Sequence, residues 1–181
     1  MAFGRPRKLF TEPELYEYAV GALARRSRSV AELKRLLRNR VEADTEFGKT
    51  LVELIIVRLK DQGYLNDARY AAAYSSYRRE TEKFGRMRVV TDLKAKGVHG
   101  DVIQKAVASI YDEVKEEDLA RAYLKRKRLH KPGDQKQAAR IFRNLMRAGF
   151  GSKTIFMILK KWDVDEETLT EIEDAVPESQ S

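Results

Sequence analysis

The stretch Gln62-Gly63-Tyr64-Leu65-Asn66-Asp67-Ala68-Arg69-Tyr70 decides the fold, because it ends one helix and begins the next within a few residues. Gly63 can adopt the positive φ that terminates a helix, and Tyr64 is expected to fold back against that terminus as an apolar contact. Asn66 is expected to cap the following helix, with Asp67 suitably placed for the helix dipole. A corner of this kind predicts short helices packed side by side.

The helix after this corner places Tyr70, Tyr74 and Tyr77 on one face. We interpret these tyrosines as core residues and keep stacking on nucleic-acid bases as the alternative. Another helix is expected from Phe84-Gly85-Arg86, ending at a second glycine stop, Lys96-Gly97-Val98. The same alternation of cap, apolar stripe and stop continues on both sides.

The rest of the chain also contains residues that mark helix starts and ends. Further helix starts are expected at Thr11, at a capping box formed by Ser29 and Glu32, at Lys49, and at caps on Asp101, Asp134 and Ser152. The helix over residues 49–62 is expected to direct Leu54 inward together with Leu51, Ile55 and Leu59. No alternating apolar run indicates a strand, so the predicted fold class is all-α.

The sequence contains an internal repeat. At a constant offset of 52, Leu93, Gly97, Val98, Ile103 and Val107 match Leu145, Gly149, Phe150, Ile155 and Leu159. An earlier unit aligns through Leu36, Arg40 and Val41 once the polar stretch 42–47 is treated as an insertion. The pattern predicts three tandem three-helix, helix-turn-helix-like repeats in an elongated curved array. The expected boundaries are a basic flexible arm at 1–11, repeats at 12–65, 66–114 and 115–163, and an acidic tail with a short helix at 164–181.

The charge of the 181-residue chain is unevenly distributed around its net value of +8. Residues 115–161 carry 14 basic and 4 acidic groups, whereas residues 162–181 carry 8 acidic groups and no basic one. This asymmetry indicates a polyanionic partner, DNA or RNA, or an acidic protein surface. The alternative is a solvated basic face without a partner.

Composition and motifs argue against several classes of function. The chain has no cysteine, which excludes disulfides and thiolate sites and fits a cytoplasmic location, and no apolar run is long enough for a membrane span. Residues 149–154 superficially resemble a phosphate-binding loop but lack its Gly-Lys-Ser/Thr order. His99 and His130 have no clustered carboxylates that could complete a metal site. We therefore expect no enzymatic activity, no cofactor and no metal.

Three segments resemble the bacterial RecX family: residues 25–33, 63–71 and 85–98. The residues that carry the resemblance are Gly63, Tyr64, Leu65, Asp67, Arg69, Tyr70, Gly85 and Gly97. Over residues 12–162 the resemblance implies three tandem three-helix repeats and a regulator, most often an inhibitor, of the recombinase RecA. It further implies binding along the groove of the RecA–DNA filament, modulation of ATP hydrolysis and strand exchange, and a role in DNA repair, homologous recombination and the SOS response. Arg40, where the family usually has glycine, the polar insertion and the acidic tail depart from the pattern.

The expected partners are therefore the RecA nucleoprotein filament and single- and double-stranded DNA, with the protein itself a monomer. The residues expected to supply the contact are Lys34, Arg35, Arg38, Arg78, Arg79, Arg86, Arg88, Lys125, Arg126, Lys127, Arg128, Arg140, Arg143 and Arg147. Three alternatives stay open: a stand-alone helix-turn-helix DNA-binding protein, a scaffold for an acidic protein, and, more distantly, an enzyme.

Overall fold

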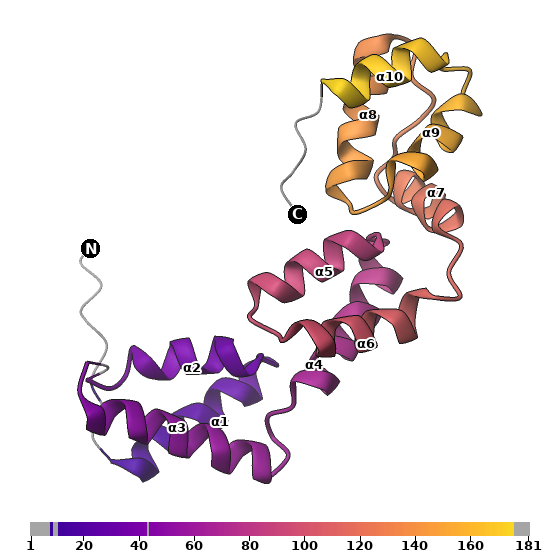
Figure 1. Cartoon of the computed structure of the whole chain (residues 1–181). Coiled ribbons are helices and arrows are strands. Elements are labelled where there is room, and N and C mark those ends of the chain that lie inside the picture. The colour runs from indigo at the N-terminus through magenta and orange to yellow at the C-terminus, as the bar shows by residue number, and fades with distance from the viewer. Residues whose placement is uncertain (1–7, 9–10, 43, 176–181) are drawn as a thin grey trace. The chain divides into compact units, whose positions relative to one another are not determined.

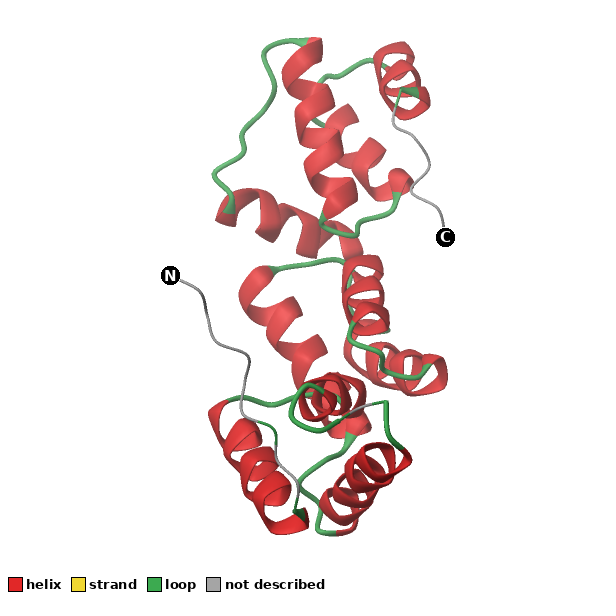
Figure 2. Cartoon of the chain, turned by 90° about the vertical axis from the view of Figure 1, so that its left-hand side faces the viewer, coloured by secondary structure: helices red, strands yellow, loops and turns green. Residues whose placement is uncertain are grey.

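The computed structural model describes residues 8, 11–42 and 44–175, and all regular structure in them is helical (Figure 1). That part of the chain forms ten α-helices and a π-helical turn and contains no strand, which confirms the predicted all-α class (Figure 2). Most of the predicted arm and the last six residues of the tail lie outside the described residues. The helices are α1 (Glu12–Arg25), α2 (Val30–Arg38), α3 (Glu46–Asp61), α4 (Asp67–Tyr77), α5 (Arg86–Ala95), α6 (Gly100–Tyr111), α7 (Glu116–Arg126), α8 (Gln135–Arg147), α9 (Ser152–Lys160) and α10 (Glu166–Asp174), with the π-helical turn at Arg78–Glu82.

The chain divides into two compact units. Unit 1 comprises residues 1–71 and 93–103, and unit 2 comprises residues 72–92 and 104–181. Helices α1–α3 belong to unit 1, α7–α10 belong to unit 2, and the three helices between them contribute residues to each unit. The division into three repeats at 12–65, 66–114 and 115–163 stays a prediction.

Unit 1 is built on the apolar faces of α1, α2 and α3, which contact one another. Helix α2 begins at the predicted capping box: Ser29 Oγ accepts the Glu32 N–H at 3.0 Å, and the Glu32 carboxylate accepts the Ser29 N–H at 3.1 Å. Leu33 and Leu37 of α2 are fully buried in the core of the unit. Leu37 is fully buried, whereas Leu36, the leucine of the predicted alignment, is partly buried and packs against the same core. The alignment of the first unit with the later ones stays a prediction.

Helix α3 begins earlier than predicted. It starts at Glu46 and not at Lys49, because Thr45 Oγ1 accepts the Gly48 N–H at 3.0 Å and caps the helix. Part of the stretch interpreted as a polar insertion is thus the first turn of a helix. Two predicted caps are also wrong, since Asp101 lies inside α6 and Ser152 is already the first residue of α9.

The inward face of α3 also differs from the prediction. Leu54 is 47% exposed, whereas Val52 and Ile56 are buried with Leu51 and Ile55. The buried face of α3 is wider than a single stripe, because the helix contacts both α1 and α2. Leu54 lies on the side that neither helix covers.

The three tyrosines of α4 are not equally enclosed. Tyr70 and Tyr74 are half-buried, and their hydroxyls donate to Glu32 and Asp92 at 3.1 and 2.9 Å. Tyr77 is 55% exposed, so its interpretation as a core residue is wrong. It is the last residue of α4, where the helix gives way to the π-helical turn.

Within unit 1, the start of α2 contacts the turn that follows α5. Ser29 Oγ donates to the Lys96 carbonyl at 2.6 Å, and Lys96 Nζ contacts the Glu32 carboxylate at 3.2 Å. At Gly97, which has φ 73°, an added Cβ would lie 2.5 Å from the Cβ of Ala31. The glycine is required there twice, for its backbone conformation and for the close approach.

Within unit 2, the start of α5 contacts the turn that follows α8 in the same way. The N–H groups of Gly85 and Met87 donate to the carbonyls of Ala148 and Gly149 at 2.8 and 3.3 Å. Gly149 has φ 90°, and an added Cβ there would lie 2.2 Å from the backbone nitrogen of Arg88. Each unit therefore contains one junction in which a glycine turn contacts the beginning of a preceding helix.

The junctions predict a difference between two glycine substitutions. Gly63 also has positive φ, 73°, but an added Cβ there would meet nothing within 4 Å. We expect Gly63→Ala to lower the unfolding free energy by about 1–2 kcal/mol through backbone strain alone. Gly149→Ala adds a backbone clash and should cost roughly 1–3 kcal/mol more. Urea unfolding followed by circular dichroism measures both, and equal losses would contradict the close approach at Gly149.

A second prediction concerns Glu32, which connects α2 to Lys96 and Tyr70. Burial alone raises the pKa of this carboxyl, but the hydrogen bonds from the Ser29 N–H, Lys96 and Tyr70 and the charge of Lys96 together hold its pKa below the ordinary 4.5. Because the pKa is lowered in the folded state, the stabilisation is present above the unfolded pKa and is lost as pH falls through the folded pKa. Glu32→Gln should therefore lower the melting temperature at pH 7 and reduce its fall in acid. If the melting temperatures of the two proteins fell by the same amount as the pH was lowered, this explanation would be contradicted.

Candidate functional site

The longest run of unopposed positive charge in the described residues lies on α8. The helix begins at the predicted cap, where the Gln137 N–H donates to Asp134 Oδ1 at 2.7 Å, and its 13 residues include no acidic side chain. The inner face is apolar, with Ala138, Ile141, Phe142 and Leu145 buried. The outer face carries Lys136, Arg140, Arg143 and Arg147, which recur at the three- and four-residue spacing of one helix face and define the α8 stripe.

The charges of the α8 stripe are not neutralised by other side chains of the described residues. All four side chains are exposed, and none forms an ion pair with a described residue. Arg147 donates only to the neutral amide oxygen of Asn144, at 3.0 Å. Four like charges on one helix face repel one another, and this repulsion is relieved by an anionic partner.

The end of α7 adds cations of two kinds. Lys125 and Arg128 are exposed and unpaired among the described residues, whereas Arg126 forms an ion pair with Glu82 at 2.9 Å. Lys127 lies over the ring of Tyr123, with 5.9 Å between Nζ and the ring centroid. Of the predicted run 125–128, two side chains are thus available for an external partner without breaking an internal contact.

Several other predicted contact residues have internal partners in unit 2. Arg78 Nε donates to the Tyr74 hydroxyl at 2.8 Å and its guanidinium lies 3.5 Å from Asp92. Arg79 donates to the Ile110 carbonyl at 2.7 Å, which satisfies a carbonyl in the last turn of α6.

The arginines at the start of α5 are also engaged. Arg86 contacts Asp112 at 3.2 Å, and Arg88 forms an ion pair with Asp92 at 2.9 Å. Arg88 also donates to the Arg147 carbonyl at 3.2 Å, so it supports the end of α8. These side chains stabilise the unit that presents the α8 stripe.

In unit 1, Lys34 forms an ion pair with Glu53 at 2.7 Å, while Arg35 and Arg38 are exposed and unpaired among the described residues. The predicted set is therefore brought together only in part. The structure separates unopposed cations from cations that hold helices in place.

The residues that carry the family resemblance are mainly structural. Leu65 is 3% exposed, Asp67 Oδ1 accepts the Val30 N–H at 2.8 Å, and Arg69 Nη2 donates to the Gly63 carbonyl at 2.7 Å. The expectation that Tyr64 folds back against the helix end is wrong, because its side chain is 57% exposed. The N–H groups of Tyr64 and Leu65 instead satisfy a carbonyl in the last turn of α3, donating to Leu59 at 2.9 and 3.1 Å.

The acidic helix α10 packs beside the α8 stripe. Leu169 and Ile172 are buried, and α10 contacts α8 and α9 (Figure 1). An open groove of about 310 Å³ has Lys136 and Arg143 on its α8 side and Glu171 on its α10 side. The acidic helix therefore lies at the edge of the stripe without pairing with its cations.

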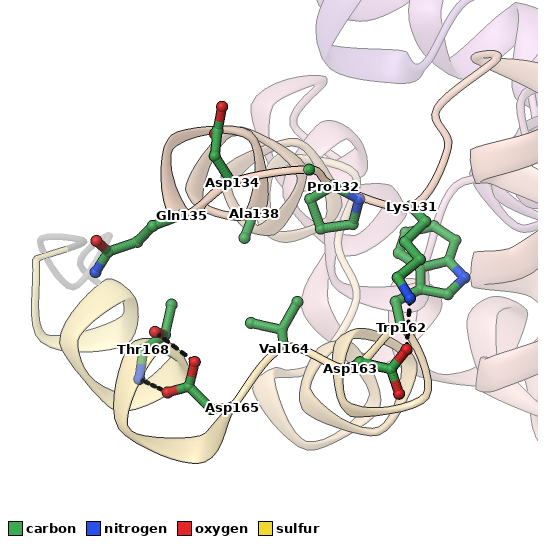
Figure 3. A pocket seen from close by; sticks show the side chains of 11 residues that line it. Lys131, Pro132, Asp134, Gln135, Ala138, Trp162, Asp163, Val164, Asp165 and Thr168 are labelled. Atoms are coloured by element: carbon green, nitrogen blue, oxygen red, sulfur yellow. Dashed lines mark hydrogen bonds and ion pairs between the residues drawn. The ribbon is translucent and has the colours of Figure 1, made fainter.

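A second cavity, of about 400 Å³, lies between the loop 131–135 and the turn that joins α9 to α10 (Figure 3). Its carboxylates already have partners: Asp163 pairs with Lys131, and Asp165 accepts from the Thr168 N–H at 2.7 Å. Among the described residues no cluster of acidic or histidine side chains could hold a metal ion. In the same part of the chain no helix is both long and apolar enough to cross a bilayer.

Lys136 is the one member of the α8 stripe that is absent from the set predicted from the sequence. Its position four residues before Arg140 is the signal that could have identified it. Lys136 lies apart from the arginines and from the run 125–128 in the sequence. It is recognised as a member of the stripe only when all residues of this helix face are considered together.

The fold and this surface define an all-helical protein with a cationic helix face. The family description "RecX, second three-helix domain" matches residues 66–107. The chain is 34% identical over 169 residues to the regulatory protein RecX of Myxococcus xanthus, covering 87% of each chain, and 32% identical over 145 residues to that of Leptothrix cholodnii, covering 80% of this chain and 87% of the relative. It belongs to the RecX family of regulatory proteins. A crystal structure of RecX from Lactobacillus salivarius has the same fold, with a TM-score of 0.65 at 21% identity over 84% of this chain and 96% of that one.

Proposed function

We propose that this protein regulates the recombinase RecA by binding along the RecA–DNA filament and inhibiting ATP hydrolysis and strand exchange in DNA repair, homologous recombination and the SOS response. The observation that carries the proposal is the α8 stripe, four exposed cations on a helix without an acidic residue. Membership of a family of regulatory proteins supports the proposal, since the relatives are named regulatory protein RecX.

The proposed phosphate and carboxylate contacts are chosen from the cations that are exposed and form no ion pair with a described residue. They are the α8 stripe, Lys125 and Arg128 in unit 2, and Arg35 and Arg38 in unit 1. A lysine or arginine without an internal partner can neutralise phosphate and release a counterion at no cost in lost ion pairs. The internally paired arginines, such as Arg78, contribute by holding the helices that present these cations.

A chain that contacts several successive parts of a filament at once opposes the movements that each turnover requires, because those contacts must break together. Binding without chemistry is therefore sufficient for inhibition. Glu171 of the acidic helix α10 lines the groove with Lys136 and Arg143. Its helix lowers the affinity of unit 2 for polyanions and so weakens binding to DNA in the absence of RecA.

A stand-alone helix-turn-helix reader is supported less well. In such a reader the second helix of the pair contacts the base edges. Here the second helix is α9, and the cations at its end are engaged: Lys160 pairs with Glu166 at 2.9 Å and Lys161 with Glu117 at 2.6 Å. Four free cations lie on α8, the first helix of the pair, whereas Lys153 is the one exposed cation of α9 without an ion pair to a described residue. This distribution suits backbone contact.

The recombinase assay gives the most informative prediction. Titrating the protein into RecA ATPase on single-stranded DNA should reduce hydrolysis at stoichiometric ratios. The double variant Arg140→Gln/Arg143→Gln should need at least about tenfold more protein for half inhibition, because charge-assisted contacts contribute about 1 kcal/mol or more each. The control Arg86→Gln/Arg121→Gln removes the same charge from side chains that have internal acidic partners. It should inhibit nearly as well as the original protein, because both ion pairs are largely exposed and each contributes at most about 1 kcal/mol to folding. Absence of inhibition by the unsubstituted chain would refute the proposal.

The salt dependence of DNA binding tests the proposed phosphate contacts separately from inhibition. Affinity for single-stranded DNA should fall steeply with salt, and loss of two phosphate contacts should reduce the slope of log K against log salt by about 1.4. Fluorescence anisotropy of a labelled oligonucleotide at several salt concentrations measures the slopes of Arg140→Gln/Arg143→Gln and of the control. Identical slopes for the two variants would show that the α8 stripe does not contact phosphate.

A further inference from the structure

The outer face of α3 carries a stripe of side chains that the other described residues of unit 1 leave uncovered. Phe47, Leu54 and Val57 are 64%, 47% and 52% exposed although they are apolar. Thr50 and Asp61, which are also exposed, share their face, because the five positions follow one another at intervals of three or four residues. These five residues form the α3 stripe.

The two edges of the α3 stripe are marked by ion pairs. On one edge Glu53 pairs with Lys34 of α2 at 2.7 Å, and on the other Arg58 pairs with Glu12 of α1 at 2.7 Å. These pairs tie α3 to its two neighbours on either side of the stripe. The face between them is therefore open to a partner from outside the unit.

The spacing of the α3 stripe selects a helix as that partner. Alternating intervals of three and four residues are the a and d positions of a heptad, which pack against a second helix. The stripe also matches itself when the second helix runs in the opposite direction. An antiparallel second copy brings Leu54 opposite Val57, and it brings the Thr50 hydroxyl opposite the Asp61 carboxylate.

The ends and the edge of the stripe fit the same register. Phe47 lies near the corner that follows α3 of the second copy, and its aromatic side chain is exposed. A two-fold axis across the helices brings the Glu53 edge of one copy beside the same edge of the other. Lys60 lies on that edge, within two residues of the level of Glu53 of the second copy, and it forms no ion pair with a described residue. Charges that flank an a/d seam set the choice and orientation of the partner helix.

We propose that α3 pairs antiparallel with α3 of a second copy of this chain, forming a two-fold symmetric dimer. The carboxylate of Asp61 supports this occupant, because it is exposed and forms no ion pair with a described residue, and the second copy offers it the hydroxyl of Thr50 as a donor. The two-fold axis makes each contact occur twice, as an isologous interface requires. A partner of another sequence would have to supply the same order of polar, charged and apolar groups by coincidence.

The pairing is weak. A stripe of five side chains is well below the about 800 Å² per partner of a standard interface, so we expect a dissociation constant above about 1 μM. The protein is then monomeric when dilute and dimeric when concentrated, which differs from the monomer expected from the sequence. The inference is independent of filament binding.

Opposite charges at one position test the pairing and its register. In sedimentation equilibrium, the apparent mass of the unsubstituted protein should rise from 20.9 kDa towards twice that value with concentration. Thr50→Lys places an ammonium group opposite Asp61 twice and should lower the dissociation constant about threefold or more. Thr50→Glu places carboxylates opposite each other and should raise it by a similar factor. Lysine and glutamate have nearly equal helix propensities, so the two variants are matched controls for each other.

A double variant with the charges exchanged between positions 50 and 61 tests whether these two positions face each other in the dimer. Thr50→Glu/Asp61→Lys restores opposite charges across the axis and should associate more tightly than Thr50→Glu alone. Both positions are exposed, and circular dichroism checks that each variant is folded.

A constant mass of one chain for the unsubstituted protein up to millimolar concentration would overturn the proposal. So would equal dissociation constants for Thr50→Lys and Thr50→Glu. Failure of the double variant to recover association while the original chain dimerises would show that another surface is responsible.

Discussion

Two glycines that end a helix against the start of another helix set the geometry of both units. Gly97 lies against Ala31 in unit 1, and Gly149 lies against the backbone of Arg88 in unit 2. At both positions the two helices approach so closely that a Cβ has no room. In unit 2 the Met87 N–H consequently reaches the Gly149 carbonyl across the junction. Each small group of helices thereby packs against an adjacent helix, which adds to the burial that its own few apolar residues provide.

Charge in this protein serves two purposes that the structure separates. Arginines with internal partners, such as Arg78 and Arg79, satisfy carboxylates and helix-end carbonyls and so keep their neighbouring helices in place. The α8 stripe has no acidic partner among the described residues. The proposed polyanionic partner would account for this stripe, and the acidic helix α10 beside it would limit how strongly that partner is held.

The sequence was sufficient for the all-α class, for most helix starts and for the glycine stops, because these depend on local rules. The capping box at Ser29 and the stop at Gly149 are examples. It was insufficient for Leu54, whose exposure depends on where α1 and α2 lie around α3, and for Tyr64, whose position depends on the tertiary surroundings of the corner. It also could not separate Arg78 from the cations of the α8 stripe, since only the folded chain shows which cation has a partner.

Site-specific photo-crosslinking tests the central claim, that the α8 stripe contacts the filament, most directly. A photoreactive residue at position 136 replaces one member of the stripe and leaves its three arginines, and the same residue at the exposed position of Glu167 on α10 is the control. Irradiation of each protein bound to RecA on single-stranded DNA should give covalent adducts from position 136 and few from position 167. Equal adducts from both positions, or none from position 136, would contradict the account.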